Sequence, residues 1–183
     1  MKPCPFFDKR GAVVFCPFCG KASFEEDNDQ RCFCKECNFT FYRNVAAAVA
    51  VVIRCKDEVL FTIRARDPGK DMLDLPGGFV NPKESLEEAA RREILEELRI
   101  DAGTLRYLFS EPNVYRYKDV NYNTIDAFFE VQLDEKPTVD VDDDVSGFVW
   151  QTLNDLKIDE IALSSIRKGV EKLKTAAFFP IAR

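Results

Sequence analysis

The sequence contains no histidine, and this absence excludes several kinds of active site. Serine or cysteine nucleophiles that depend on an imidazole base are excluded, and so are phosphohistidine relays. A zinc site in this chain must also be built without imidazole ligands. Chemistry near neutral pH therefore has to come from carboxylates, cysteines or a bound metal ion.

Long hydrophobic runs are absent as well. The longest is Val45–Ile53, whereas a helix that spans a bilayer needs about 20 apolar residues. Near the N-terminus, the apolar stretch Ala12–Phe15 is too short for a signal peptide. We therefore expect a cytoplasmic protein that does not bind a membrane.

The chain has fewer basic residues than acidic residues. The chain has 26 Lys and Arg against 32 Asp and Glu, which gives a net charge of -6. Proteins that bind long nucleic acids independently of sequence usually present a basic face. We expect small phosphorylated ligands, whose charge a metal ion neutralises, and no polymeric nucleic acid. Homodimer formation is left open by the sequence.

Cysteine, in contrast, is plentiful. The seven cysteines of a chain without a secretory signal favour metal binding over disulfides. Two CxxC knuckles with this spacing are typical of a tetrahedral structural zinc site, and its ligands would be Cys16, Cys19, Cys34 and Cys37. Either knuckle alone would also fit a redox motif. Cys32 lies close enough to replace Cys34, and Cys4 has no evident partner.

The length of 183 residues allows one ordinary domain and a small module. We expect residues 1–43 to form a zinc ribbon and residues 44–183 an α/β domain with a mixed sheet between helices. The expected strands are Val45–Cys55, Val59–Arg66, Leu73–Leu75, Leu105–Ser110, Thr124–Leu133 and Val145–Gln151. Besides the helix described next, we expect helices at Thr152–Leu156 and Ser164–Ala176.

The most informative stretch is Leu75–Ile100, in which a glycine turn precedes an acidic helix. Ser85 and Glu88 form a capping box, which starts the helix at Leu86. An apolar residue then recurs at every fourth position, as expected for the face that packs on a core; these residues are Leu86, Ala90, Ile94 and Leu98.

Glu93, Glu96 and Glu97 stand at i, i+3 and i+4 on this helix, so we expect their side chains to converge. Carboxylates gathered at one edge repel each other, and Mg²⁺ removes that repulsion while it binds substrate phosphates. The alternative is a solvated helix face held together by ion pairs with Arg91, Arg92 and Arg99.

The spacing of Gly78, Glu84, Arg92-Glu93-Ile94, Glu96-Glu97 and Ile100 resembles the Nudix box, G-x5-E-x7-R-E-U-x-E-E-x-G-U, where U is apolar. Eight of nine specified positions agree. The exception is Arg99, where the box has the glycine that ends the helix in a left-handed conformation. A different residue there costs about 1 kcal/mol.

The resemblance covers roughly residues 44–160 and implies the Nudix α/β/α fold. It also implies hydrolysis of a nucleoside diphosphate linked to a moiety X, with Mg²⁺ or Mn²⁺ as cofactor. Glu93, Glu96, Glu97 and the Gly78 carbonyl would bind the metal, Arg92 would hold the glutamates, and Glu84 would be an outer carboxylate. The alternative is a non-catalytic nucleotide sensor whose ribbon binds a partner.

A zinc ribbon before a Nudix domain is similar to the NADH pyrophosphatase group of this family. That group has SQPWPFP after the box, and this chain has the stretch Ser110–Tyr117, which lacks the tryptophan and the other prolines. NADH specificity is therefore not predicted.

Further residues are candidates for substrate binding because of their side-chain type and their position in the chain. The candidate phosphate contacts are Arg64, Arg66, Lys70 and Arg116, and the candidate base-stacking residues are Tyr115, Tyr117, Phe79 and Phe109. Many Nudix enzymes supply a further metal ligand or general base from a loop before a tryptophan-bearing strand. Asp144, before Trp150, matches that position, with Glu130 as the second candidate and Asp142 as a solvated neighbour. Glu93 is the other candidate base.

Overall fold

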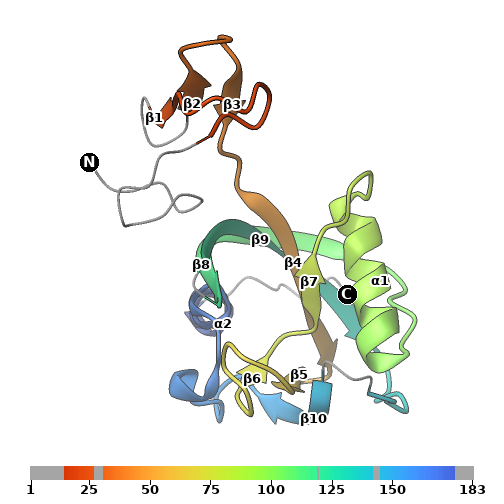
Figure 1. The fold of residues 1–183 in the computed structure, drawn as a ribbon. Coiled ribbons are helices and arrows are strands. Elements are labelled where there is room, and N and C mark those ends of the chain that lie inside the picture. The colour runs from red at the N-terminus through yellow and green to blue at the C-terminus, as the bar shows by residue number, and fades with distance from the viewer. Residues whose placement is uncertain (1–14, 27–30, 119, 142–144, 176–183) are drawn as a thin grey trace.

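The computed structural model describes residues 15–26, 31–118, 120–141 and 145–175, and it contains two separate sheets (Figure 1). The smaller sheet has the order β1-β2-β3, with β1 at Phe24–Glu26, β2 at Arg31–Cys34 and β3 at Thr40–Tyr42. Figure 1 shows this sheet standing away from the main body, at the start of β4 (Ala46–Cys55).

The larger, seven-stranded sheet has the order β10-β5-β4-β9-β8, with β6 paired to β5 and β7 to β4. β4 runs parallel to β9, and the other strand pairs are antiparallel, so the sheet is mixed, as predicted. The strand bounds are β5 Glu58–Arg64, β6 Leu73–Asp74, β7 Gly77–Phe79, β8 Arg106–Tyr117, β9 Val120–Leu133 and β10 Val145–Thr152.

Two helices, α1 (Leu86–Leu98) and α2 (Ser164–Thr175), cover opposite faces of this sheet (Figure 1). The central strand β4 supplies both interfaces, because alternate side chains of a strand point to opposite faces. Val49, Val51 and Ile53 pack in the core with α1, whereas Ala50 and Val52 pack in the core with α2. This arrangement is the predicted α/β/α sandwich.

Helix α1 begins and ends as its sequence predicts. The Ser85 hydroxyl accepts a hydrogen bond from the Glu88 backbone N–H, and the Glu88 carboxylate accepts one from the Ser85 backbone N–H. At the other end Arg99 adopts the left-handed conformation (φ 57°, ψ 30°), and its N–H donates to the Leu95 carbonyl. The arginine therefore replaces the expected glycine without changing how the helix ends.

The structure differs from the expected secondary structure in several places. Gly77–Phe79 form strand β7 where a turn was expected, and β9 begins at Val120 instead of Thr124. The expected helix Thr152–Leu156 is replaced by the end of β10 and a turn over residues 153–155, which the Thr152 hydroxyl closes by hydrogen bonds with the Asp155 backbone and carboxylate. A short 3-10 helix, η1, follows at Ile158–Glu160. Strand β8 continues through Pro112 to Tyr117, well beyond the expected end at Ser110. A proline is tolerated there because β8 is an edge strand of the sheet.

No helix in the described part of the chain is long and apolar enough to cross a membrane.

Candidate active site and metal centre

The two CxxC knuckles meet in the smaller sheet. The sulfur atoms of Cys16, Cys19, Cys34 and Cys37 all lie within 4.8 Å of one another. The Cys16–Cys37 and Cys19–Cys34 distances are 3.8 and 3.7 Å. A tetrahedron with Zn–S bonds of about 2.3 Å has edges of about 3.8 Å, so the four sulfurs fit a zinc ion.

The neighbouring thiols change one another's acidity. Burial raises the pKa of Cys34, but hydrogen bonds from Ser23 and from the Cys37 and Glu36 backbone lower it to about 6. Cys37 has a backbone hydrogen bond from Phe39 that lowers its pKa, but burial and the surrounding thiols raise it to about 12. Four thiolates cannot share this volume without a cation, and the chemistry of the donor set fits a structural metal.

The fifth cysteine of this region stands apart from the four. Cys32 is buried in the ribbon core but does not belong to the sulfur cluster, so the structure selects Cys34. Cys4 lies outside the described residues.

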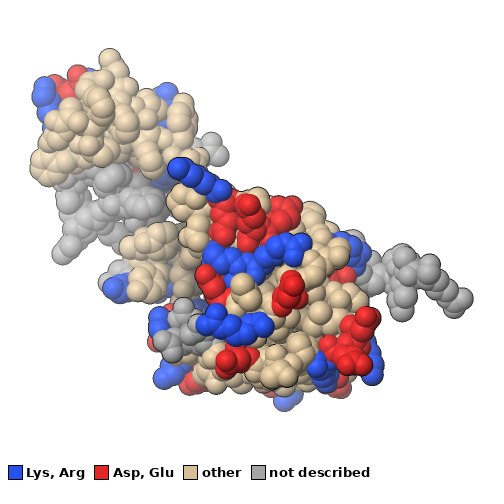
Figure 2. Space-filling view, turned by 90° about the vertical axis from the view of Figure 1, so that its right-hand side faces the viewer, with Lys and Arg blue, Asp and Glu red and all other residues tan. Residues whose placement is uncertain are grey.

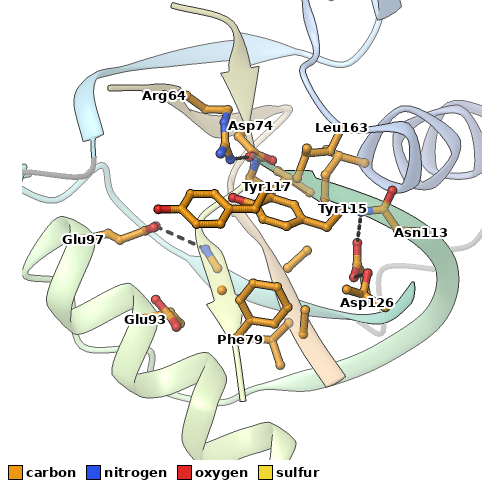
Figure 3. Close-up of a pocket in the computed structure, with 18 of the residues that line it drawn as sticks. Arg64, Asp74, Phe79, Glu93, Glu97, Asn113, Tyr115, Tyr117, Asp126 and Leu163 are labelled. Atoms are coloured by element: carbon orange, nitrogen blue, oxygen red, sulfur yellow. Dashed lines mark hydrogen bonds and ion pairs between the residues drawn. The ribbon is translucent and has the colours of Figure 1, made fainter. Parts of the chain in front are cut away.

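The main domain contains a cleft of about 430 Å³ between the C-terminal half of α1 and the end of β8 (Figure 3). Glu93 and Glu97 reach it from α1, and Gly77, Gly78 and Phe79 form its floor from β7. The close backbone packing requires glycine at position 77, where φ is +152° and a Cβ atom would lie 2.0 Å from the Val49 carbonyl oxygen.

The two cleft-lining glutamates depend on this glycine strand for their positions. The Gly77 N–H donates to Glu97 Oε2 at 3.2 Å. A Cβ atom on Gly78 would lie 2.4 Å from Glu93 Oε1, so the missing side chain leaves the space that the carboxylate uses. Burial raises the pKa of Glu93, although the adjacent Arg92 lowers it.

Arg92 holds the carboxylates beside the cleft together. Its guanidinium donates to Glu84 at 2.7 and 3.0 Å, to Glu93 at 2.8 Å and to Glu96 at 2.9 Å. It also donates to the Phe79 carbonyl at 3.0 Å. The Glu84 hydrogen bonds contribute most to raising the pKa of Arg92, and they lower the pKa of Glu84 in turn.

The predicted convergence of three glutamates is only partly present. Glu93 and Glu97 line the cleft, but the Glu96 side chain is 56% exposed and pairs with Arg92 at the cleft's outer edge. Figure 2, which faces the side of the molecule where α1 lies, shows acidic groups alternating with basic ones. Arg92 donates from one nitrogen to both Glu93 and Glu96, so its positive charge offsets the repulsion between these two carboxylates.

The other candidate residues divide into two groups. Arg64, Arg66, Phe79, Tyr115 and Tyr117 line the cleft, and Figure 3 shows the tyrosine rings between the α1 glutamates and the opposite wall. Three do not line it, namely Lys70, Arg116 and Phe109. Arg116 donates to the Lys118 carbonyl, and Phe109 stacks on Phe128 in the core. The placement of Arg116 was missed because β8 was expected to end at Ser110, before this residue.

The two candidates for a further metal ligand or general base were Asp144 and Glu130, and the structure does not place either of them in the cleft. Glu130 is buried, pairs with Arg54 and Arg106, and does not line the cleft. Asp142 and Asp144 lie outside the described residues.

The cleft also contains polar residues that sequence reasoning did not select, namely Asp74, Asn113, Thr124 and Asp126. All four are at most 7% exposed. Asp74 and Asp126 each lie in an otherwise apolar strand sequence, Leu73-Asp74-Leu75 and Ile125-Asp126-Ala127. A carboxylate in a buried strand was the signal that could have identified them.

The donor atoms beside α1 fit a hard divalent cation. Two carboxylates and the backbone of a glycine strand lie at one wall, and oxygen ligands are those that Mg²⁺ and Mn²⁺ prefer. In the described part of the chain, only the four cysteines bring three or more ligand atoms within 4.8 Å of one another. The glutamate side chains would therefore have to close around an ion.

Comparison with known proteins identifies the family to which this chain belongs. A family profile described as the NUDIX domain matches residues 43–172, which include α1 with its glutamates, the cleft and most of α2. The chain belongs to the Nudix family. The resemblance found in the residues from Gly78 to Ile100 is thereby confirmed.

Curated relatives of this Nudix chain include two proteins named NAD-capped RNA hydrolase NudC. The protein from Yersinia enterocolitica is 36% identical over 98 residues, which are 54% of this chain and 37% of that protein. The protein from Pectobacterium atrosepticum is 34% identical over the same shares. The chain thus matches little more than a third of the length of these relatives.

Solved structures share the fold. A NUDIX hydrolase from Nitrosomonas europaea has a TM-score of 0.64 and 22% identity, over 86% of this chain and 90% of that one. The NUDIX domain of Shewanella oneidensis NrtR, solved with ADP ribose, has a TM-score of 0.58 and 19% identity, over 73% and 88%.

Proposed function

We infer that this Nudix chain is a divalent-metal-dependent pyrophosphohydrolase that cleaves a nucleoside diphosphate linked to a moiety X. The main support is the position of Glu93 and Glu97 on one wall of a cleft that also contains two arginines and three aromatic side chains. This combination suits a phosphate chain with a planar group attached to it.

In this proposal Glu93, Glu96, Glu97 and the Gly78 backbone hold the ion, and Arg92 positions the glutamates. A bound Mg²⁺ or Mn²⁺ supplies Lewis acidity at phosphorus and lowers the pKa of a bound water. Arg64 and Arg66 contact phosphate oxygens across the cleft. The raised pKa of Glu93 suits it to accept a proton, and Asp144 is the other candidate for this role.

We also propose that residues 1–43 form a zinc-ribbon module and residues 44–183 the hydrolase domain. The ribbon would bind one zinc through Cys16, Cys19, Cys34 and Cys37. It supplies folding energy that so few residues cannot obtain from burial alone.

The identity of the moiety X has to be determined by a direct assay. Phosphate or mononucleotide release should be measured with Mg²⁺ and with Mn²⁺ over dinucleotides, ADP-ribose, nucleotide sugars and nucleoside triphosphates. NAD and an NAD-capped RNA belong in this panel because two relatives carry that activity in their names. The capped RNA also tests our expectation, from the net charge, that polymeric nucleic acid is not a substrate.

Glu97→Gln tests the chemistry itself. The amide keeps the shape of the side chain but loses the charge that would hold the ion, so hydrolysis should fall by about 10³-fold or more. Thermal unfolding of the variant should remain close to wild type. Wild-type turnover in this variant, or no hydrolysis of any substrate by the wild type, would favour a nucleotide sensor with a partner-binding ribbon.

A further inference from the structure

The wall of the cleft opposite α1 contains a buried carboxylate, Asp126 on β9. It is 5% exposed and lines the same continuous cleft as Glu93 and Glu97 (Figure 3). A nucleotide with its diphosphate at the α1 glutamates therefore has its remaining part directed toward Asp126. This step rests on the proposed function.

Asp126 has neutral hydrogen-bond partners. Its Oδ1 accepts from the Thr124 hydroxyl at 2.8 Å, and its Oδ2 accepts from Ser165 Oγ at 2.5 Å and from Asn113 Nδ2 at 3.3 Å. A carboxylate offers about four acceptor positions. These three bonds leave one acceptor position, and it is on Oδ1.

The surroundings of Asp126 are rich in negative charge. Asp74 also lines this part of the cleft, and its pKa is raised by burial and by the charge of Asp126, against the lowering effect of Arg64. Arg64 binds Asp74 at 2.5 Å. Arg64 is thus paired with Asp74, whereas Asp126 has only neutral donors as partners among the described residues. A ligand group that donates a hydrogen bond is therefore favoured at Asp126 over one that only accepts.

The ligand group at this wall is also expected to be planar. The Phe79 and Tyr115 rings meet edge to face, with centroids 5.5 Å apart at 88°, and both line the cleft. Two perpendicular rings offer a face and an edge to a flat heterocycle.

We propose that Asp126 is a specificity residue that accepts a hydrogen bond from the amino group of the substrate's nucleobase. Adenine, guanine and cytosine carry such a group. A base in which hydrogen replaces the amino group leaves the buried acceptor without its partner, and its binding is weakened accordingly.

A purely structural role is the competing explanation, because Asp126 ties β9 to α2 through Ser165. The two roles differ in one measurable respect. Loss of a structural tie weakens the binding of all ligands alike, whereas loss of the base contact removes the preference for the amino group.

Equilibrium binding by calorimetry tests this with nucleoside monophosphates, which contain no anhydride to cleave. Three pairs differ only in the amino group: AMP and purine riboside monophosphate, GMP and IMP, and CMP and 2-pyrimidinone riboside monophosphate. In the wild type, the amino member of at least one pair should bind about 10- to 100-fold more tightly, as expected for a hydrogen bond to a charged acceptor.

Asp126→Asn should erase that preference. Asn113 and Ser165 both donate to the Oδ2 position, so the amide oxygen of the variant will take that place. Its NH₂ group then stands where Oδ1 was and faces the ligand's own donor. Asp126→Leu, with folding checked by thermal unfolding, should erase the preference as well.

Glu130→Gln is the matched control. Glu130 lies on the same strand with similar burial, but it pairs with Arg54 and Arg106 outside the cleft, so the variant should keep the preference. The proposal fails if no pair differs by more than about twofold, if none of the six ligands binds, or if Asp126→Asn keeps the preference. Binding is measured without turnover, so failure of the hydrolysis assay alone would reject the proposed function and not this subsite.

Discussion

The cysteines of the ribbon and the glutamates of α1 were both predicted as metal ligands, but the structure arranges them differently. The four sulfurs lie within 4.8 Å of one another. Glu93 and Glu97 line the cleft, whereas Glu96 is 56% exposed and does not line it, although Glu93 and Glu96 accept from the same nitrogen of Arg92. Cysteine side chains are short, and backbone hydrogen bonds such as Gly20 N–H to Cys16 O and Asn38 N–H to Cys34 O fix each knuckle.

Glutamates, in contrast, are long and negatively charged. They separate unless a cation holds them together, and Arg92 serves as that cation in part. Short side chains on hydrogen-bonded knuckles thus hold their ligand atoms closer together than long anionic side chains on a helix do.

The largest change is expected at the ribbon. Cys19→Ser would remove one of the four proposed zinc ligands, and a structural zinc ion contributes much of the folding energy of a small module. Purified protein should lose its single zinc, as measured by elemental analysis, and residues 16–42 should exchange amide hydrogens faster. Hydrolysis should fall only indirectly.

Cys32→Ser is the control, since Cys32 is buried beside the site but does not belong to the cluster. This variant should retain zinc. Zinc-free wild-type protein with a Cys16–Cys19 disulfide would reverse the assignment to a redox motif.

The loop before β10 should give the next largest effect. We expect Asp144→Asn to lower kcat by about 10²-fold or more with little change in KM, because a base acting through water contributes about 10²- to 10⁴-fold. Asp142→Asn should change almost nothing. Equal steady-state kinetics for the two variants would leave Glu93 as the base.

A smaller effect is expected at Gly78, where the added methyl group of Gly78→Ala would lie 2.4 Å from Glu93 Oε1. The end of a long side chain can move away, so thermal stability should change little. The displaced carboxylate should lower kcat by about tenfold, a moderate loss for displaced catalytic geometry.

Gly147→Ala is the control for this variant, because its Cβ atom would meet Ile63 at an ordinary 3.5 Å. Its kcat should match the wild type. A Gly78→Ala enzyme with unchanged kcat would show that the Glu93 position in the structure is not the one used in turnover.

The smallest effect is a pH dependence at Glu84. Its hydrogen bonds from Arg92 lower its pKa in the folded protein, so the ionised form stabilises the fold. That contribution is fully present above the ordinary glutamate pKa of about 4.3 and is lost as the pH falls through the lower folded-state value. The melting temperature of Glu84→Gln should therefore lie below wild type at pH 7, and the difference should shrink toward pH 3. A difference that does not vary with pH would mean that the charge of Glu84 contributes nothing.

Local patterns predicted the parts of the fold that depend on neighbours in sequence. Ser85 and Glu88 specify where α1 begins, and the β-rich run Val45–Cys55 predicted strand β4. The turn at Thr152 was misread as a helix because a few helix-compatible residues do not reveal that one hydroxyl closes the turn. The length of β8 was underestimated because Pro112 signals a break unless the strand is known to be an edge.

The sequence by itself determined the chemical type of each site in this protein. No histidine, two CxxC knuckles and the spacing from Gly78 to Ile100 are properties of the chain alone, and they require thiolate and carboxylate ligands. Only the tertiary structure decided which of these residues face one space. Asp126 and Glu130 are both acidic and both buried in β9, but Asp126 lines the cleft and Glu130 pairs with two arginines outside it. That difference depends on which strands and helices pack against each position, and residues distant in the sequence provide those neighbours.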